Sequence, residues 1–309
     1  MTMDRRTFLG LIGGGLLGAG IAACGGSDTR TFIVASGERG GFQSEFAGLL
    51  QSATADDRIR LQRINSHGSV DNITMLREGR VSFGLSLADV AVERRTGIDA
   101  VGRVYENYVQ FAVPADSPVQ RFADLRGQRV SLGARGSGTE FTGLRILGAA
   151  GMTPDDIVIT PVSLTDVLTS LANGTVAAAM WAGGVPTPSA VPRPGYGPPS
   201  GIRLLDLSAE LVELRRRYGP MYEPVSIPAH MYGRSTETAT IGVPSMLLTT
   251  PSTPDDAVTA VVDVLVDRAA DLIPPGTVGV QFLDTQSLIQ TYGLPLHPAA
   301  RAAYRRHHG

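Results

Sequence analysis

Lysine is absent from this sequence of 309 residues, so all 27 basic side chains are arginines. An enzyme that forms a Schiff base with its substrate, or that anchors pyridoxal phosphate, needs a lysine amine. The phosphate-binding Walker A loop needs a lysine as well. The sequence therefore excludes these three classes of enzyme.

The sequence also has a single cysteine and a net charge close to zero. Cys24 is the only cysteine, which excludes intramolecular disulfides, cysteine-rich zinc sites, iron–sulfur clusters and a thiol nucleophile further along the chain. The five histidines form no H-E-x-x-H motif, so we expect neither a metal nor a cofactor. The 29 acidic side chains nearly balance the basic ones and give a net charge of -2, so we expect no nucleic-acid partner.

The N-terminal residues have the parts of an export signal in their usual order. Arg5 and Arg6 precede an apolar, glycine-rich run, and two alanines directly precede Cys24. The pattern resembles a twin-arginine signal peptide joined to a lipoprotein cleavage box, and the alternative is a membrane-anchor helix. We predict a signal peptide over residues 1–23, lipidation of Cys24 and a flexible tether over residues 24–30. The mature protein would then be lipid-anchored outside the cytoplasm, in the periplasm or on the outer face of the membrane.

Strand and helix patterns alternate after the tether. Apolar runs predict strands at residues 31–35, 59–64 and 81–87, with helices that begin after glycine-rich loops at Phe42 and Ser69. Repeats of this kind predict a parallel sheet with helices on both faces. The functional edge of such a sheet lies at the carboxyl ends of its strands.

The chain is long enough for two α/β units, and two segments are expected to cross between them. An extended run at residues 109–113 predicts the first crossing near residues 113–118, and the second is expected between residues 219 and 241. This organisation gives lobe I over residues 31–114 and 219–309, and lobe II over residues 115–218. Six prolines predict an irregular segment over residues 185–200. The basic tail from residue 299 predicts a solvated helix end, with a membrane-surface contact as the alternative.

The most informative segment is a strand, a glycine loop and a helix start over residues 130–141. Glycines such as Gly138 let the backbone approach a ligand closely, while Ser137 and Thr139 offer hydroxyl groups. The free N–H groups of a new helix point outward with partial positive charge, so the segment suits an anionic group. The alternative is an ordinary tight turn in which Ser137 or Thr139 caps the helix. The segment matches neither a dinucleotide fingerprint nor a G-x-S-x-G nucleophile elbow.

Several motifs resemble, in their order along the chain, the TAXI group of extracytoplasmic solute receptors. They are Gly40-Gly41-Phe42, Gly68-Ser69-Val70-Asp71-Asn72, Phe122-Ala123-Asp124-Leu125-Arg126-Gly127, Ser137-Gly138-Thr139-Glu140 and Ala182-Gly183-Gly184-Val185-Pro186. The resemblance implies an α/β fold of the type II periplasmic-binding-protein class, with a ligand cleft between two lobes. It also implies a cargo such as glutamate, glutamine or a related dicarboxylate, and TRAP-type membrane permease subunits as partners.

We assign twelve residues to the cleft, ten of them carried over from the resemblance and two, Arg135 and Tyr222, from their places in the sequence. They are Gly41, Phe42, Ser69, Arg135, Ser137, Gly138, Thr139, Trp181, Gly184, Val185, Pro186 and Tyr222. Trp181 and Tyr222 have a core position as the alternative, and Arg135 a solvated one.

Two other functions compete with carboxylate binding. The same fold could bind another oxyanion, such as a phosphonate or a sulfonate, because the glycine loop alone permits it. A secreted serine hydrolase with Ser137 as nucleophile is weaker, because no spacing in the sequence provides a base for it. We therefore expect a binding protein that is not an enzyme.

Overall fold

The computed structural model describes residues 29–55, 59–233, 235–279 and 281–308. The predicted signal peptide, Cys24 and most of the tether lie outside the described residues. The strands are β1 (Arg30–Ala35), β2 (Ile59–Ile64), β3 (Phe83–Leu87), β4 (Asp99–Pro114), β5 (Arg129–Ser131), β6 (Val158–Ile159), β7 (Ala178–Gly183), β8 (Ile202–Leu204), β9 (Glu223–Ile227) and β10 (Thr238–Thr249). The α-helices are α1 (Phe42–Ala53), α2 (Ser69–Arg77), α3 (Ala88–Glu93), α4 (Gly138–Ala149), α5 (Val167–Ala172), α6 (Ser208–Tyr218), α7 (Asp255–Asp267), α8 (Thr285–Leu288) and α9 (Pro298–His308).

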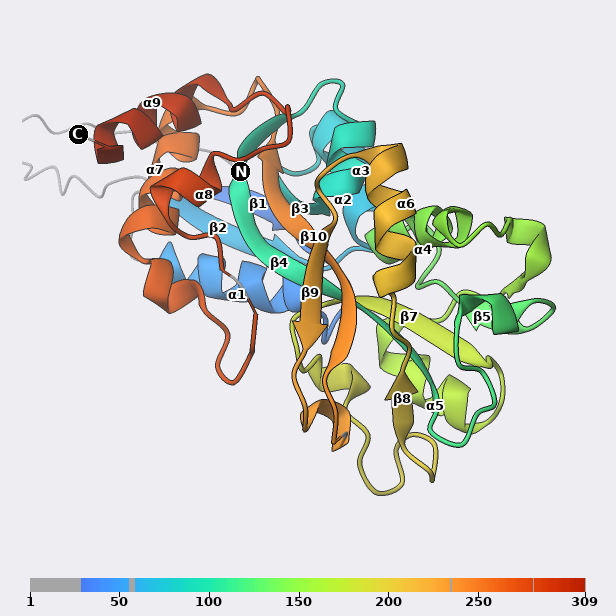
Figure 1. The fold of residues 1–309 in the computed structure, drawn as a ribbon. Coiled ribbons are helices and arrows are strands. Elements are labelled where there is room, and N and C mark those ends of the chain that lie inside the picture. The colour runs from blue at the N-terminus through green and yellow to red at the C-terminus, as the bar shows by residue number, and fades with distance from the viewer. Residues whose placement is uncertain (1–28, 56–58, 234, 280, 309) are drawn as a thin grey trace, which may run out of the picture.

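The strands form one continuous sheet of ten strands (Figure 1). Its order is β2-β1-β3-β10-β4-β7-β5-β6, with β9 beside β10 and β8 beside β4. The pairs of β1 with β2 and β3, and of β5 with β6 and β7, are parallel. However, β10 is antiparallel to β3 and β4, and β4 is antiparallel to β7. The expectation of a parallel sheet is therefore wrong at the centre, because strands of opposite direction join the two halves there.

Strand β4 connects the halves. Its residues 99–113 are all buried, although the run includes Arg103, Glu106 and Asn107. Tyr108 pairs with Gly242 on β10 along one edge and with Gly183 on β7 along the other. We call the part with β1–β3 the first half and the part with β5–β8 the second half. The limits predicted for the two lobes, at residues 114 and 219, stay a prediction.

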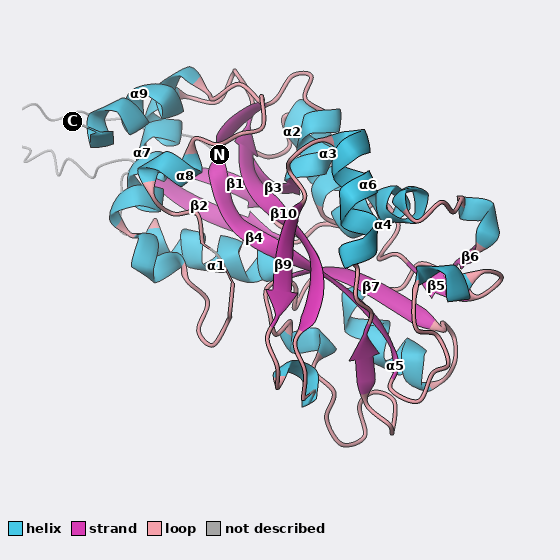
Figure 2. Ribbon diagram, in the orientation of Figure 1, coloured by secondary structure: helices cyan, strands magenta, loops and turns pink. Residues whose placement is uncertain are grey.

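Helices cover both faces of the sheet (Figure 2). One core packs apolar side chains of α2, α3, α4 and α6 against the sheet. A second core, on the opposite face of the first half, contains α1, α7, α8 and α9. A third, smaller core lies under α5 in the second half. The predicted layering is thus present in each half.

A buried carboxyl group joins the halves behind the sheet. Asp89 on α3 accepts hydrogen bonds from Thr142 on α4 (2.7 Å) and from the Tyr222 hydroxyl (2.9 Å). Arg145 of α4 donates to the Tyr222 hydroxyl (3.2 Å) and to Glu93 on α3 (2.8 Å). Burial raises the pKa of Asp89, whereas the two hydroxyl groups and the guanidinium lower it. This cluster holds the N-terminal part of α3 against α4.

A second buried acid lies on β4 itself. Glu106 is 3% exposed, and its Oε1 has no hydrogen-bond partner among the described residues. Burial and the nearby Glu223 raise its pKa well above 4.5, against the opposing effect of Arg103. Arg103 itself stacks on the Phe282 ring at 3.5 Å and lies 3.7 Å from Glu223. Glu106 is therefore protonated in the folded chain over a pH range in which it would be ionised in the unfolded chain.

The Glu106→Gln variant should flatten the dependence of stability on pH. Because the folded pKa of Glu106 is raised, wild-type stability should fall as pH rises above about 4.5. The glutamine cannot ionise, so the variant should have a higher urea midpoint than wild type at pH 8 and a similar one at pH 4. Glu237→Gln, at an exposed position, is the matched control. Equal urea midpoints of Glu106→Gln and wild type at pH 8 would contradict the prediction.

Candidate functional site

A cavity of about 60 Å³ lies between the two halves of the molecule. The first half lines it with Gly37, Glu38, Gly41, Phe42, Gln43, His67, Gly68, Ser69 and Leu87, and the connecting strand β4 adds Asn107. The second half lines it with Gly133, Ser137, Gly138, Thr139, Val162, Leu164, Val167, Met180, Trp181 and Ala182. The cavity is thus enclosed by both halves in nearly equal share, at the carboxyl ends of β1, β3 and β7.

Three helices begin at this cavity. Their N-cap residues are Gly41 for α1, Gly68 for α2 and Ser137 for α4. The N–H groups in the first turn of a helix have no partner within the helix and carry a partial positive charge. The three helix starts therefore give the cavity an anion-attracting lining, although no arginine is among the described residues that line it.

Two of these starts, from different halves, touch each other. A Cβ atom on Gly68 would lie 3.7 Å from the backbone nitrogen of Gly138. A Cβ atom on Gly138 would collide with the Ser69 hydroxyl oxygen. Glycine is required at residue 138 because the two helix starts approach so closely.

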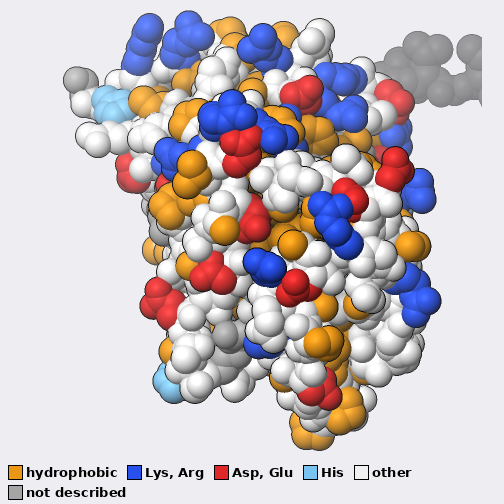
Figure 3. Space-filling view, turned by 45° about the vertical axis from the view of Figure 1, so that its right-hand side comes forward, with side chains coloured by type: hydrophobic (Ala, Val, Ile, Leu, Met, Phe, Trp, Pro, Cys, Tyr) orange, Lys and Arg blue, Asp and Glu red, His pale blue; other side chains and the backbone are white. Residues whose placement is uncertain are grey.

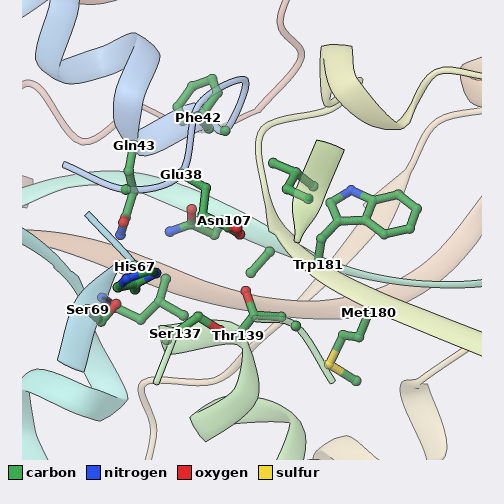
Figure 4. Close-up of a pocket in the computed structure, with 18 of the residues that line it drawn as sticks. Glu38, Phe42, Gln43, His67, Ser69, Asn107, Ser137, Thr139, Met180 and Trp181 are labelled. Atoms are coloured by element: carbon green, nitrogen blue, oxygen red, sulfur yellow. Dashed lines mark hydrogen bonds between the residues drawn. The ribbon is translucent and has the colours of Figure 1, made fainter. Parts of the chain in front are cut away.

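Ser137 and Thr139 have different tasks in the glycine loop. The Ser137 Oγ accepts a hydrogen bond from the Glu140 backbone N–H (3.0 Å), so it acts as the N-cap of α4. In the described part of the chain no basic group is hydrogen-bonded to this hydroxyl, as a serine nucleophile would need. The Thr139 side chain points into the cavity (Figure 4). Ser137 keeps its O–H proton while it caps the helix, so both hydroxyl groups can donate to a ligand in the cavity.

Aromatic rings form the apolar wall. Trp181 is 3% exposed, its ring lines the cavity, and its Nε1 donates to Thr187 Oγ1 (3.2 Å). Trp181 is thus a core residue that also lines the cavity, and its contact with a ligand stays a prediction. Phe42 packs edge-on against the buried Tyr105 at 4.6 Å between ring centroids.

Four polar side chains line the cavity that the sequence analysis did not assign to it: Glu38, Gln43, His67 and Asn107. Burial raises the pKa of Glu38, while the Leu164 backbone N–H from the second half and the nearby His67 lower it. Asn107 is 1% exposed and donates from Nδ2 to the Val243 carbonyl (3.0 Å) and to Ser245 Oγ (2.9 Å). A polar residue inside a strand that is otherwise buried is the signal that could have identified Asn107.

The structure brings together seven of the twelve residues assigned to the cleft. These are Gly41, Phe42, Ser69, Ser137, Gly138, Thr139 and Trp181. The other five do not line the cavity. The Arg135 side chain is exposed, and the Tyr222 hydroxyl donates a hydrogen bond to Asp89. Gly184 packs on the Phe42 ring, Val185 is buried, and Pro186 lines a separate hollow. A role in ligand binding stays a prediction for all twelve.

Two further features were sought in the described part of the chain. Its acidic, histidine and cysteine side chains form no group of three or more that could hold a metal ion. Its helices include none with the length and apolar character needed to cross a membrane.

Several solved structures are similar to this chain at low sequence identity. A structure of a protein from Bordetella bronchiseptica RB50 aligns with a TM-score of 0.54 and 12% identity over 91% of this chain and 99% of that chain. The alkanesulfonate-binding protein SsuA from Xanthomonas axonopodis pv. citri, bound to MOPS, aligns with a TM-score of 0.46 and 17% identity over 90% of this chain and 84% of that one. The substrate-binding protein of an amino acid ABC transporter aligns with a TM-score of 0.47 and 13% identity over 78% and 95% of the two chains.

A family model assigns the chain more directly, because the NMT1-like family matches residues 44–307. This match does not support the narrower TAXI assignment, but it agrees with the predicted two-lobe, solute-binding class of fold. The chain belongs to the NMT1-like family, a family of periplasmic solute-binding proteins.

Proposed function

We propose that the mature protein captures a small organic oxyanion outside the cytoplasm and delivers it to a membrane permease, without catalytic turnover. The observation that carries this proposal is the contact between the starts of α2 and α4, with the Thr139 hydroxyl beside it. An anion at this junction would accept hydrogen bonds from backbone N–H groups of both halves. The interspersed acidic and basic side chains on the face in Figure 3 suit a small ligand better than a nucleic acid.

A sulfonate fits the junction better than the carboxylate expected from the TAXI resemblance. A carboxylate has two oxygens and a sulfonate has three, and the site combines two helix starts with the hydroxyl groups of Ser69, Ser137 and Thr139. We therefore favour the alternative oxyanion cargo over a dicarboxylate. The narrower form of the proposal, delivery to TRAP-type permease subunits, rests on the order of motifs alone.

Replacing Thr139 by valine should weaken anion binding at least about tenfold. The variant keeps the side-chain shape but loses a hydrogen bond to a charged group, which typically contributes about 1.5–3 kcal/mol. A tenfold change corresponds to about 1.4 kcal/mol. Calorimetry with ethanesulfonate and with glutarate measures the effect, and Thr169→Val on the exposed side of α5 is the matched control. Unchanged affinity of Thr139→Val for both anions would remove Thr139 from the site.

Replacing Gly184 by alanine should hinder closure of the two halves. A Cβ atom there would collide with the Phe42 ring of the first half. At Gly183, one residue earlier, a Cβ atom would make ordinary contacts of 3.4 Å and 3.5 Å. We expect Gly184→Ala to bind ethanesulfonate at least about tenfold more weakly (about 1.4 kcal/mol) and Gly183→Ala to bind within about twofold of wild type. Equal affinities of the two variants would show that this contact does not limit closure.

The lipid anchor is a separate part of the proposal, and it depends on the sequence around Cys24. A Cys24→Ala variant cannot be acylated, so it should be released from membranes or remain as an unprocessed precursor. Membrane fractionation and gel mobility of the full-length chain, compared with wild type, test this. Identical fractionation and mobility of the two proteins would show that Cys24 carries no anchor.

A further inference from the structure

Helix α9 exposes a stripe of arginines opposite the side that packs in the core of the first half. The packed side consists of small residues and one aromatic residue: Ala299, Ala300, Ala303 and Tyr304. Arg301 and Arg305 lie one turn apart on the other side, and both are exposed. Neither side chain forms a hydrogen bond or an ion pair with another described residue, and Arg301 acts on Asp99 only through its charge. The helix contains no acidic residue.

The stability of the helix does not account for this stripe. Cations in the last turn of a helix are favourable because that end carries a partial negative charge, which suits Arg305. Arg301 lies near the start of α9, where a cation gains nothing from the helix dipole. Two like charges one turn apart also repel each other and weaken a helix. A partner with several negative charges would relieve this repulsion.

The stripe lies near the point where the predicted tether enters the fold. Arg30, the first residue of β1, forms an ion pair with Asp256 on α7. Asp263 lies two turns further along α7, about 10 Å away, and contacts Arg306 (3.4 Å) and His307 (2.9 Å) of α9. Figure 1 shows α7 and α9 together at the end of the molecule opposite to α5 and β8. The tether and the basic helix are thus attached to the same helix, α7.

The length of the tether keeps this end of the molecule close to a membrane. Cys24 precedes Arg30 by six residues, which span at most about 20 Å when fully extended. A lipid on Cys24 would therefore hold α9 close to the bilayer surface. A contact at such a short range needs little affinity of its own, because the tether raises the effective concentration of the helix at the lipid.

The acidic side chains near the stripe belong to α7. Asp256 and Asp263 are paired with basic side chains, and Asp267 lies 3.7 Å from His307. Asp255 is exposed at the start of the same helix. An anionic surface would repel the α7 side of this end and attract the α9 side. The charges therefore favour one orientation of the molecule on such a surface.

We propose that the exposed side of α9, with Arg301 and Arg305 at its centre, docks on the anionic lipid headgroups of the membrane that holds the anchor. This inference rests on the lipid anchor in the proposed function and goes beyond it, because it adds a second contact that orients the anchored protein. The end with α9 faces the bilayer, and the end with α5 and β8 points away from it.

Modification of arginines on vesicles tests the contact residue by residue. The mature chain is coupled through Cys24, its only thiol, to a maleimide lipid, so the result does not depend on acylation in cells. On vesicles that contain phosphatidylglycerol, Arg301 and Arg305 should react with phenylglyoxal at least about threefold more slowly than on pure phosphatidylcholine. High salt should abolish the difference. Arg193, exposed in the second half, is the internal control and should react at the same rate on both.

Two outcomes would overturn the inference. Equal rates for Arg301 and Arg305 on the two kinds of vesicle would show that lipid does not attract the stripe, as expected if it meets an acidic protein surface instead. Slowing of Arg193 to the same extent would show that no particular side of the protein faces the bilayer. Both outcomes leave the lipid anchor in place, because the Cys24→Ala variant tests the anchor separately.

A double variant assigns the contact to the two arginines. Arg306 is also exposed on α9, so in the wild-type protein it should react more slowly on the anionic vesicles. Arg301→Gln combined with Arg305→Gln should abolish this slowing. The matched control, Arg121→Gln combined with Arg193→Gln, removes the same charge from exposed positions of the second half and should keep it. Persistent slowing of Arg306 in the first double variant would show that the stripe does not hold α9 at the surface.

Discussion

The starts of helices α2 and α4 carry the same partial charge and touch each other beside the cavity, although they belong to different halves of the molecule. The starts of α2 and α4 each carry a charge equivalent to about +0.5, and Gly68 and Gly138 bring them into contact. Without a counter-charge this contact is repulsive. A bound anion beside both helix starts would replace this repulsion by two favourable interactions. Under the proposed function, ligand binding and closure would therefore be coupled by electrostatics, and the same N–H groups would serve both.

Strand β4, which joins the two halves, buries several polar and charged side chains. Strand β4 buries Arg103, Glu106, Asn107 and Gln110 in a position where an isolated sheet would place apolar residues. Most of these side chains find partners on neighbouring elements, as Asn107 does on β10. Asp89 provides a further link between α3 and α4. The two halves are thus tied by polar contacts on both sides of the cavity, which fixes the relative position of their helix starts.

The sequence predicted the parts of this site that depend on local structure. The helix starts at Phe42 and Ser69 and the glycine loop before α4 follow from glycine and hydroxyl patterns within a few residues. The contacts that lie far apart in the chain were not predicted. Asn107 bonds to a carbonyl 136 residues away, and Tyr222, expected in the cleft, bonds to Asp89 133 residues away. The antiparallel centre of the sheet was missed for the same reason, since strand direction depends on which distant strands pair.

Trp181 gives the molecule an optical property. It is the only tryptophan in the sequence, it lines the cavity, and its hydrogen bond to Thr187 holds the indole in place. All indole fluorescence of the protein therefore originates in the wall of the site, with no background from other tryptophans. A molecule that displaces water from this wall would change the emission of the whole protein, so the native chain carries its own reporter of occupancy.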